Sequence, residues 1–387
     1  MNNILNQSNI FDNIKAFILV VLCFYSFSIQ GQKNAETQIK LVFNQLITAY
    51  GSPKSAPALV FMKTNPKATT PAFYKDKIIK VDLRLYELCQ TFGKDSLNVL
   101  AVVVSHELAH YYYEHDFCSD FAYAIQNKSV QFSKGLKLIN KNQKVIYETQ
   151  ADDKGLFYAA IAGFNPFEIQ PKILDAIYKF YQLKDINVGY PSKAERKAIA
   201  QNALTKTQKL YSIFQQAIQA KEQKEYDRSL ALFETVNQDF PSRENYNNIG
   251  VLKTLKALNL KVLAKDEADY PKRFLYPLEI DNTSRLNQSG TRSNGDDAKQ
   301  QQMIALLKSA QKDFTEAIRL DENYTIAYIN SACVYDLLDN PNGAITRILE
   351  LPLDAQKTTD AQRILAIGYY HADNEKKAEA IWKELKL

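Results

Sequence analysis

Apolar residues in the first part of the chain follow the spacing of helices and short strands. Residues 33–50 carry apolar side chains every three or four positions, which predicts an amphipathic helix that ends before Gly51. The segment 57–63 has the composition of a strand, and 72–82 predicts a β-hairpin. A helix over 83–91 follows, so this region predicts a mixed α+β domain with a small sheet.

The next predicted helix begins after Asp95, which is a good N-cap residue. It is apolar on nearly every side, which indicates burial, yet it contains His106, Glu107 and His110 in an H-E-x-x-H motif. Residues four apart lie on one helix face, so the two imidazoles can bind one zinc ion, with Glu107 as general base toward the attacking water. The alternative interpretation is a helix that carries histidines by chance.

Two residues are candidates for the third ligand. His115 lies five residues after His110, about 140° further around the helix, and no glycine turns the chain back toward the site. His115 is therefore interpreted as a structural hydrogen-bonding residue. Glu148 lies on the next long helix, where it can complete a His2Glu site, and Asp152, on the same face, can accept the second N–H of a ligand histidine. The alternative is a solvated acidic turn at a helix N-terminus.

The C-terminal half is helical throughout and repeats itself every 34 residues. The repeating positions are Ala310, Ala344 and Ala378; Phe314, Ile348 and Trp382; Ala317, Leu351 and Leu385; Ala332 and Ala366; and Tyr335 and Tyr369. An earlier unit fits at 210–241, and an insertion around 258–300 splits the second unit. Within the insertion, the apolar segment 270–280 is expected to dock on folded protein, with the N-terminal domain as one candidate surface. This period is typical of tetratricopeptide repeats, which form an α-solenoid; a generic helical bundle is the alternative.

Composition limits the remaining choices. The chain has 387 residues, 46% hydrophobic and 24% charged, which indicates more than one globular domain. Its net charge of +5 is mild, and no run of basic and aromatic residues indicates binding to nucleic acid. Cys89, Cys118 and Cys333 follow the N-terminal segment without a C-x-x-C motif, which argues against a disulfide framework or a cysteine zinc site. Cys89 and Cys118 could pair in an exported protein; two buried free thiols are the alternative.

An apolar run over residues 16–30 follows Lys15. It is shorter than the roughly 20 residues of a membrane-spanning helix, and it suits a secretory signal peptide cleaved near Gly31. This predicts an exported protein, in a bacterial periplasm. A retained N-terminal anchor in the inner membrane is the alternative.

Three motifs together resemble one family of peptidases. They are HELAHYYYEH (106–115), ETQAD (148–152) and AGFNP (162–166), and they are similar to those of the HtpX-like gluzincins. That family includes the CAAX prenyl proteases and the β-barrel-assembly-enhancing protease, whose soluble, exported branch is the nearer match. The resemblance implies a zincin-type domain that binds one Zn²⁺ through His106, His110 and Glu148.

The same family commonly has T-H-P followed by an arginine. The corresponding residues here are Gly189-Tyr190-Pro191 and Arg196, so Tyr190 replaces a histidine that lies near the metal in the family. A tyrosine O–H can donate a hydrogen bond to a developing oxyanion. A packing role for Tyr190 is the alternative.

The expectations are therefore a mainly α protein with a signal peptide over 1–31, a zinc metallopeptidase domain over 32–204 and a tetratricopeptide-repeat domain over 205–387. The expected function is zinc-dependent cleavage of exported or envelope proteins, with the repeats recruiting substrate or a protein of an envelope complex. The alternative function is a non-catalytic adaptor or chaperone with a structural or latent zinc site.

Overall fold

The computed structural model describes most of the chain. The described residues are 33–62, 71–75, 77–115, 141–183, 191–281 and 297–387. The expected signal peptide, Cys118, Tyr190 and most of the polar end of the insertion lie outside them. The fold is mainly helical with one small sheet, which confirms the coarse fold prediction. The chain divides into a compact unit of Met1–Leu46 and Pro57–Leu204 and a second of Ile47–Ala56 and Thr205–Leu387.

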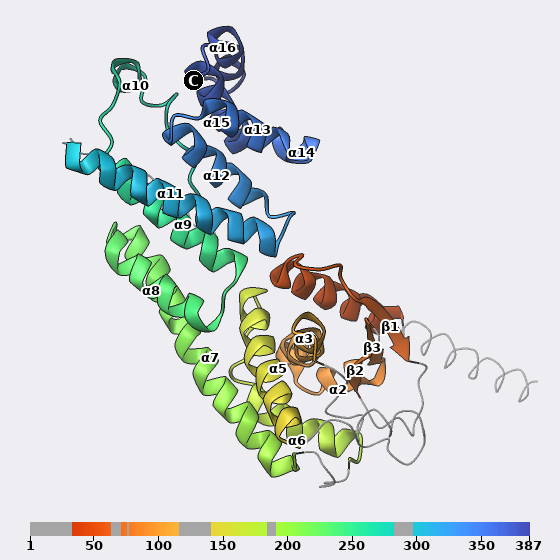
Figure 1. The fold of residues 1–387 in the computed structure, drawn as a ribbon. Coiled ribbons are helices and arrows are strands. Elements are labelled where there is room, and N and C mark those ends of the chain that lie inside the picture. Colours follow the sequence, from red (N-terminus) through yellow and green to blue (C-terminus); the bar gives the residue numbers. More distant parts are fainter. Residues whose placement is uncertain (1–32, 63–70, 76, 116–140, 184–190, 282–296) are drawn as a thin grey trace, which may run out of the picture. The chain divides into compact units, whose positions relative to one another are not determined.

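The sheet of the first unit has three strands in the order β1-β3-β2 (Figure 1). The predicted hairpin is present: β2 (Ala72–Lys75) and β3 (Ile78–Asp82) pair antiparallel. β1 (Ala58–Met62) pairs with β3 in parallel, which the sequence pattern did not predict. β2 therefore lies at one edge of this sheet.

The first unit also contains helices, of which α3 (Ser96–Tyr112) packs against β2. They are most of a helix over residues 33–50, α2 (Arg84–Gln90), the short 3-10 helix η1 (Gly93–Asp95), α3, α5 (Lys141–Ile161), α6 (Gln170–Phe180) and the first part of α7 (Lys193–Glu222). α3 is buried continuously from Val99 to Tyr111, as its all-round apolar pattern predicts. Asp95 occupies the predicted N-cap position, but its carboxylate accepts a hydrogen bond from Asn98 Nδ2 at 3.1 Å and caps no backbone N–H.

A close contact between α3 and α5 depends on Gly155. A Cβ atom at this position would lie 3.0 Å from both the backbone N and the Cα of His106. The missing side chain lets the two helix backbones approach. The approach brings α5 residues within reach of the histidines on α3.

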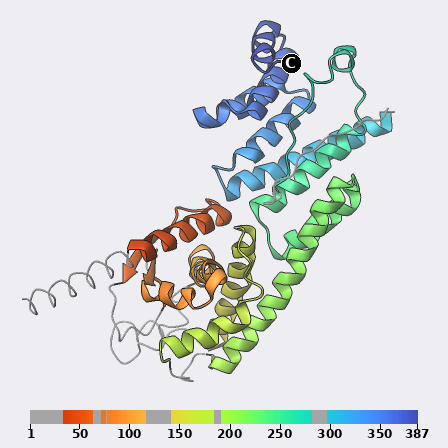
Figure 2. The same ribbon diagram turned by 180° about the vertical axis from the view of Figure 1, so that it is seen from behind.

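The second unit contains an array of antiparallel helix pairs (Figure 2). Its helices after α7 are α8 (Tyr226–Asp239), α9 (Arg243–Leu258), α10 (Lys265–Asp269), α11 (Asp297–Leu320), α12 (Thr325–Leu337), α13 (Pro341–Leu349), α14 (Leu353–Gln356), α15 (Thr359–His371) and α16 (Glu375–Glu384). α9 packs against α11 although the insertion separates them in sequence. The repeating alanines Ala310, Ala344 and Ala378 are all buried, as small residues between closely packed helices should be.

The structure also bears on the cysteines and on the helices that could cross a membrane. Cys89 and Cys333 are buried free thiols. None of the described helices combines the length and the apolar character that a membrane crossing requires.

Candidate metal centre

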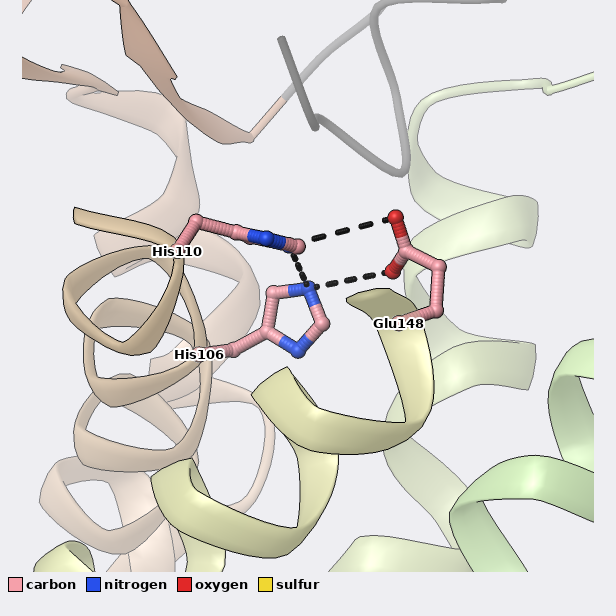
Figure 3. A group of neighbouring side chains, drawn as sticks. All are labelled: His106, His110 and Glu148. Carbon is pink, nitrogen blue, oxygen red and sulfur yellow. Dashed lines mark hydrogen bonds and ion pairs between the residues drawn. The ribbon is translucent and has the colours of Figure 1, made fainter. Parts of the chain in front are cut away.

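Three buried side chains from α3 and α5 point toward one another (Figure 3). The Nε2 atoms of His106 and His110 are 3.1 Å apart. Glu148 Oε2 lies 3.3 Å from His106 Nε2, and Glu148 Oε1 lies 3.8 Å from His110 Nε2. The i, i+4 spacing on α3 and the opposite helix α5 therefore bring together the three residues that the sequence predicted as ligands.

The far nitrogen of His106 has a carboxylate partner. His106 Nδ1 lies 2.9 Å from Asp152 Oδ1, one helical turn after Glu148. Asp152 also accepts two hydrogen bonds from the buried guanidinium of Arg196, at 3.0 and 3.3 Å. A third contact joins Arg196 Nη2 to Glu148 Oε2 at 3.4 Å. Because Asp152 accepts the Nδ1–H, the Nε2 lone pair of His106 faces the centre.

The far nitrogen of His110 has a histidine partner. His110 Nδ1 lies 2.9 Å from His115 Nδ1, and His115 Nε2 lies 2.8 Å from Gln150 Oε1. His115 also stacks on Tyr147 with ring centroids 4.7 Å apart. Burial lowers the pKa of His115 to about 4, so this imidazole is neutral. With its proton on Nε2 toward Gln150, His115 accepts the Nδ1–H of His110 and leaves the His110 Nε2 lone pair facing the centre.

The donor set fits a divalent metal ion. Two imidazole lone pairs and a carboxylate repel one another at these separations unless a cation lies between them. A tetrahedral ion with ligand bonds of about 2.0–2.1 Å places its ligand atoms roughly 3.3 Å apart. The distances of 3.1, 3.3 and 3.8 Å between the donor atoms are close to that value. His106, His110 and Glu148 can therefore hold a metal ion.

Glu107 lies beside this group and faces the sheet. Its side chain is fully buried, and its Oε2 accepts a hydrogen bond from the backbone N–H of Tyr74 at 2.9 Å. Tyr74 belongs to β2, so this strand lies against α3. Glu107 and His106 also line a small cavity of about 40 Å³, whose walls include apolar residues of α3 and α6. This volume is enough for one or two water molecules.

Several contributors to the site were not predicted from the sequence. Gly155 has a recognisable signal, since a glycine in the middle of a helix, two turns after Glu148, indicates close packing against another helix. The sequence contains no signal for the other two contributors. Gln150 is an ordinary polar residue, and the Tyr74 N–H belongs to the backbone.

No protein-family model matches the chain, and no curated protein matches it. The resemblance of its motifs to the HtpX-like gluzincins therefore remains a prediction from those motifs.

Proposed function

We propose that the protein is a zinc-dependent endopeptidase of the HtpX-like gluzincin type, with a zincin-type first unit and a second unit built from tetratricopeptide repeats. The observation that carries this proposal is the convergence of His106, His110 and Glu148 with the carboxylate of Glu107 beside them. A purely structural metal site does not require a buried carboxylate next to its first ligand.

Two nitrogen donors and one carboxylate favour zinc, because oxygen-only sites are typical of Mg²⁺ and Ca²⁺. Zinc in such a site acts as a Lewis acid and lowers the pKa of a coordinated water. Asp152 and His115 keep the two histidines in the tautomer that binds metal. Glu107 accepts the proton of the attacking water and then donates it to the leaving nitrogen of the peptide bond.

We place the substrate beside β2, at the edge of the sheet. An extended peptide can add to the edge of a sheet through main-chain hydrogen bonds. The Tyr74 N–H of β2 donates to Glu107, so a peptide bound beside this strand passes the catalytic helix. Unfolded or extended segments of exported and envelope proteins are the substrates we propose, with the mature enzyme in a bacterial periplasm. The role of Tyr190 as a donor to the oxyanion belongs to the same proposal.

The test compares the wild-type protein with Glu107→Gln. The wild type is expected to contain one zinc per chain by mass spectrometry of the metal and to cleave a reduced, unfolded test protein. Glu107→Gln is expected to retain the zinc and lose at least about 100-fold in cleavage rate, as for the loss of a general base.

Glu114→Gln is the matched control, since it makes the same chemical change at an exposed position just after α3. It should cleave as the wild type does. Wild-type protein without zinc would refute the metal site. Zinc-loaded protein that cleaves nothing would instead favour the adaptor or chaperone function.

A further inference from the structure

Residues 271–281 form neither a regular helix nor a strand, yet they pack into the helical array of their own unit. Phe274, Tyr276 and Ile280 are buried, whereas Leu275 between the first two is 52% exposed. Alternation of this kind is typical of an extended chain lying on a surface. In Figures 1 and 2 the segment after α10 passes alongside α12.

Three asparagines hold the main chain of this segment. Asn330 on α12 accepts a hydrogen bond from Glu279 N at 3.0 Å and donates one to Glu279 O at 2.8 Å. Asn248 on α9 accepts from Asp281 N and donates to Asp281 O, both at 2.7 Å. The backbone N–H and C=O of Glu279 and of Asp281 are therefore bound by side-chain amides, as a neighbouring β-strand would bind them.

Asn247 connects these two contacts. It donates to Glu279 O at 3.1 Å and accepts from Asn330 Nδ2 at 2.8 Å. All three asparagines are fully buried. Because the contacts go to backbone atoms, this network recognises an extended chain without regard to its side chains.

Side-chain contacts add selectivity at three positions. Phe274 packs among Tyr370, His371 and Trp382, with ring centroids 5.1, 5.7 and 5.4 Å away. The Tyr276 O–H donates to Asp336 Oδ2 at 2.7 Å, and the Asp281 carboxylate accepts from the Tyr324 O–H at 2.7 Å. The pattern recognised is an aromatic residue, a second aromatic residue two positions later and an acidic residue five positions after that.

The segment lies outside the 34-residue repeat, although Phe274 and Tyr276 belong to the same hydrophobic cluster as Ala344, Ala378 and Trp382. The segment comes from the insertion that interrupts one pair. Release of the segment would expose the three asparagines, and water would replace their backbone partners.

We infer that the groove formed by α9, α12, α15 and α16 binds extended segments of partner proteins, and that residues 272–281 are its tethered competitor. The partner segment carries aromatic residues at the places of Phe274 and Tyr276 and an acidic residue at the place of Asp281. Tethering gives the internal segment an effective concentration of roughly millimolar. If the internal segment has a micromolar intrinsic Kd, a partner segment therefore binds about 1,000-fold more weakly until the internal segment is released.

The experiment measures binding of a fluorescent peptide with the sequence of residues 270–281 to the full-length protein, by anisotropy. The double variant Phe274→Ala, Tyr276→Ala weakens the internal segment and leaves the groove intact. It is expected to bind the peptide at least about 100-fold more tightly than the wild type. Adding Asn330→Ala should remove this gain, and a peptide that carries the same two alanines should not bind.

Leu275→Ala is the matched control, because this side chain is exposed, and it should bind the peptide as weakly as the wild type. Tyr276→Phe, which removes only the hydrogen bond to Asp336, should give about a tenfold gain and tests the proposal even where the double variant does not fold. A folded double variant, or a folded Tyr276→Phe, that binds the peptide no more tightly than the wild type would show that the segment is integral core and overturn the inference.

Discussion

Substitution of Gly155 by alanine tests whether close packing of α5 on α3 builds the metal centre. The added Cβ would lie 3.0 Å from two backbone atoms of His106, whereas ordinary contacts begin near 3.4 Å. Neither atom belongs to a flexible side chain, so the helices must separate by about 0.4 Å or more. Glu148 lies two helical turns from Gly155 on the same face of α5 and moves with it.

Two opposing effects set the stability of this variant. Alanine favours a helix over glycine by about 1 kcal/mol, and overpacking costs about 1–3 kcal/mol. The free energy of unfolding should therefore fall by about 0–2 kcal/mol. Metal sites tolerate deviations in ligand distance of only about 0.2 Å, so the separation should weaken zinc binding by about tenfold or more.

Zinc affinity is measured by competition with a chromophoric chelator, and stability by urea denaturation. Gly250→Ala is the control. Its Cβ would lie 2.8 Å from the ring of Phe314 in the second unit, so it also overpacks a helix contact but leaves the metal centre alone. It should lose stability and keep the wild-type zinc affinity. A Gly155→Ala protein that binds zinc as tightly as the wild type would refute the reasoning.

Three further predictions concern other contacts. Asp152→Asn should weaken zinc binding about 10–100-fold in the same competition assay because it disturbs the partner of His106; Asp153→Asn, which removes the same charge from another face of α5, should not. Ser242→Ala removes the side-chain cap of α9 and should lower the free energy of unfolding by about 1 kcal/mol in urea titrations; no measurable change would contradict this. Burial opposes the charge of His371, but the hydrogen bond to Asp336 outweighs it and raises the pKa above the usual 6.5. The stability from this pair is therefore complete below pH 6.5 and lost as the pH rises through the raised pKa. Urea titrations from pH 6 to pH 9 should show a larger loss for the wild type than for His371→Gln, and equal losses would refute the assignment.

The sequence predicted the parts of the fold that depend on local patterns. The helix over 33–50, the hairpin and the buried α3 all follow from the spacing of apolar residues and from turn residues. The parallel pairing of β1 with β3 could not be predicted in this way, because it depends on partners distant in sequence. Docking of the 270–280 segment was expected, but its acceptor surface lies in its own unit and depends on three asparagines whose spacing follows no periodic pattern.

In the candidate site too, the features that follow from local spacing were predictable and those that depend on distant partners were not. Helical spacing alone placed His106 and His110 on one face of α3, and Glu148 and Asp152 on one face of α5. The chain from His110 through His115 to Gln150 was not predictable, since it requires the turn after α3 to bring His115 back against His110. An imidazole that accepts a hydrogen bond from another imidazole has no sequence signature, because its tautomer is set by the next partner in space.

The charged residues around the centre favour a divalent cation over a monovalent one. Glu107, Glu148 and Asp152 are buried acidic residues, and the buried guanidinium of Arg196 contacts two of them, Asp152 and Glu148. Arg196 therefore joins the carboxylate that orients His106 to the carboxylate that faces the two Nε2 atoms. Because Coulomb attraction grows with the charge of the ion, a divalent cation held by the two Nε2 atoms and Glu148 would gain more from these carboxylates than a monovalent cation would.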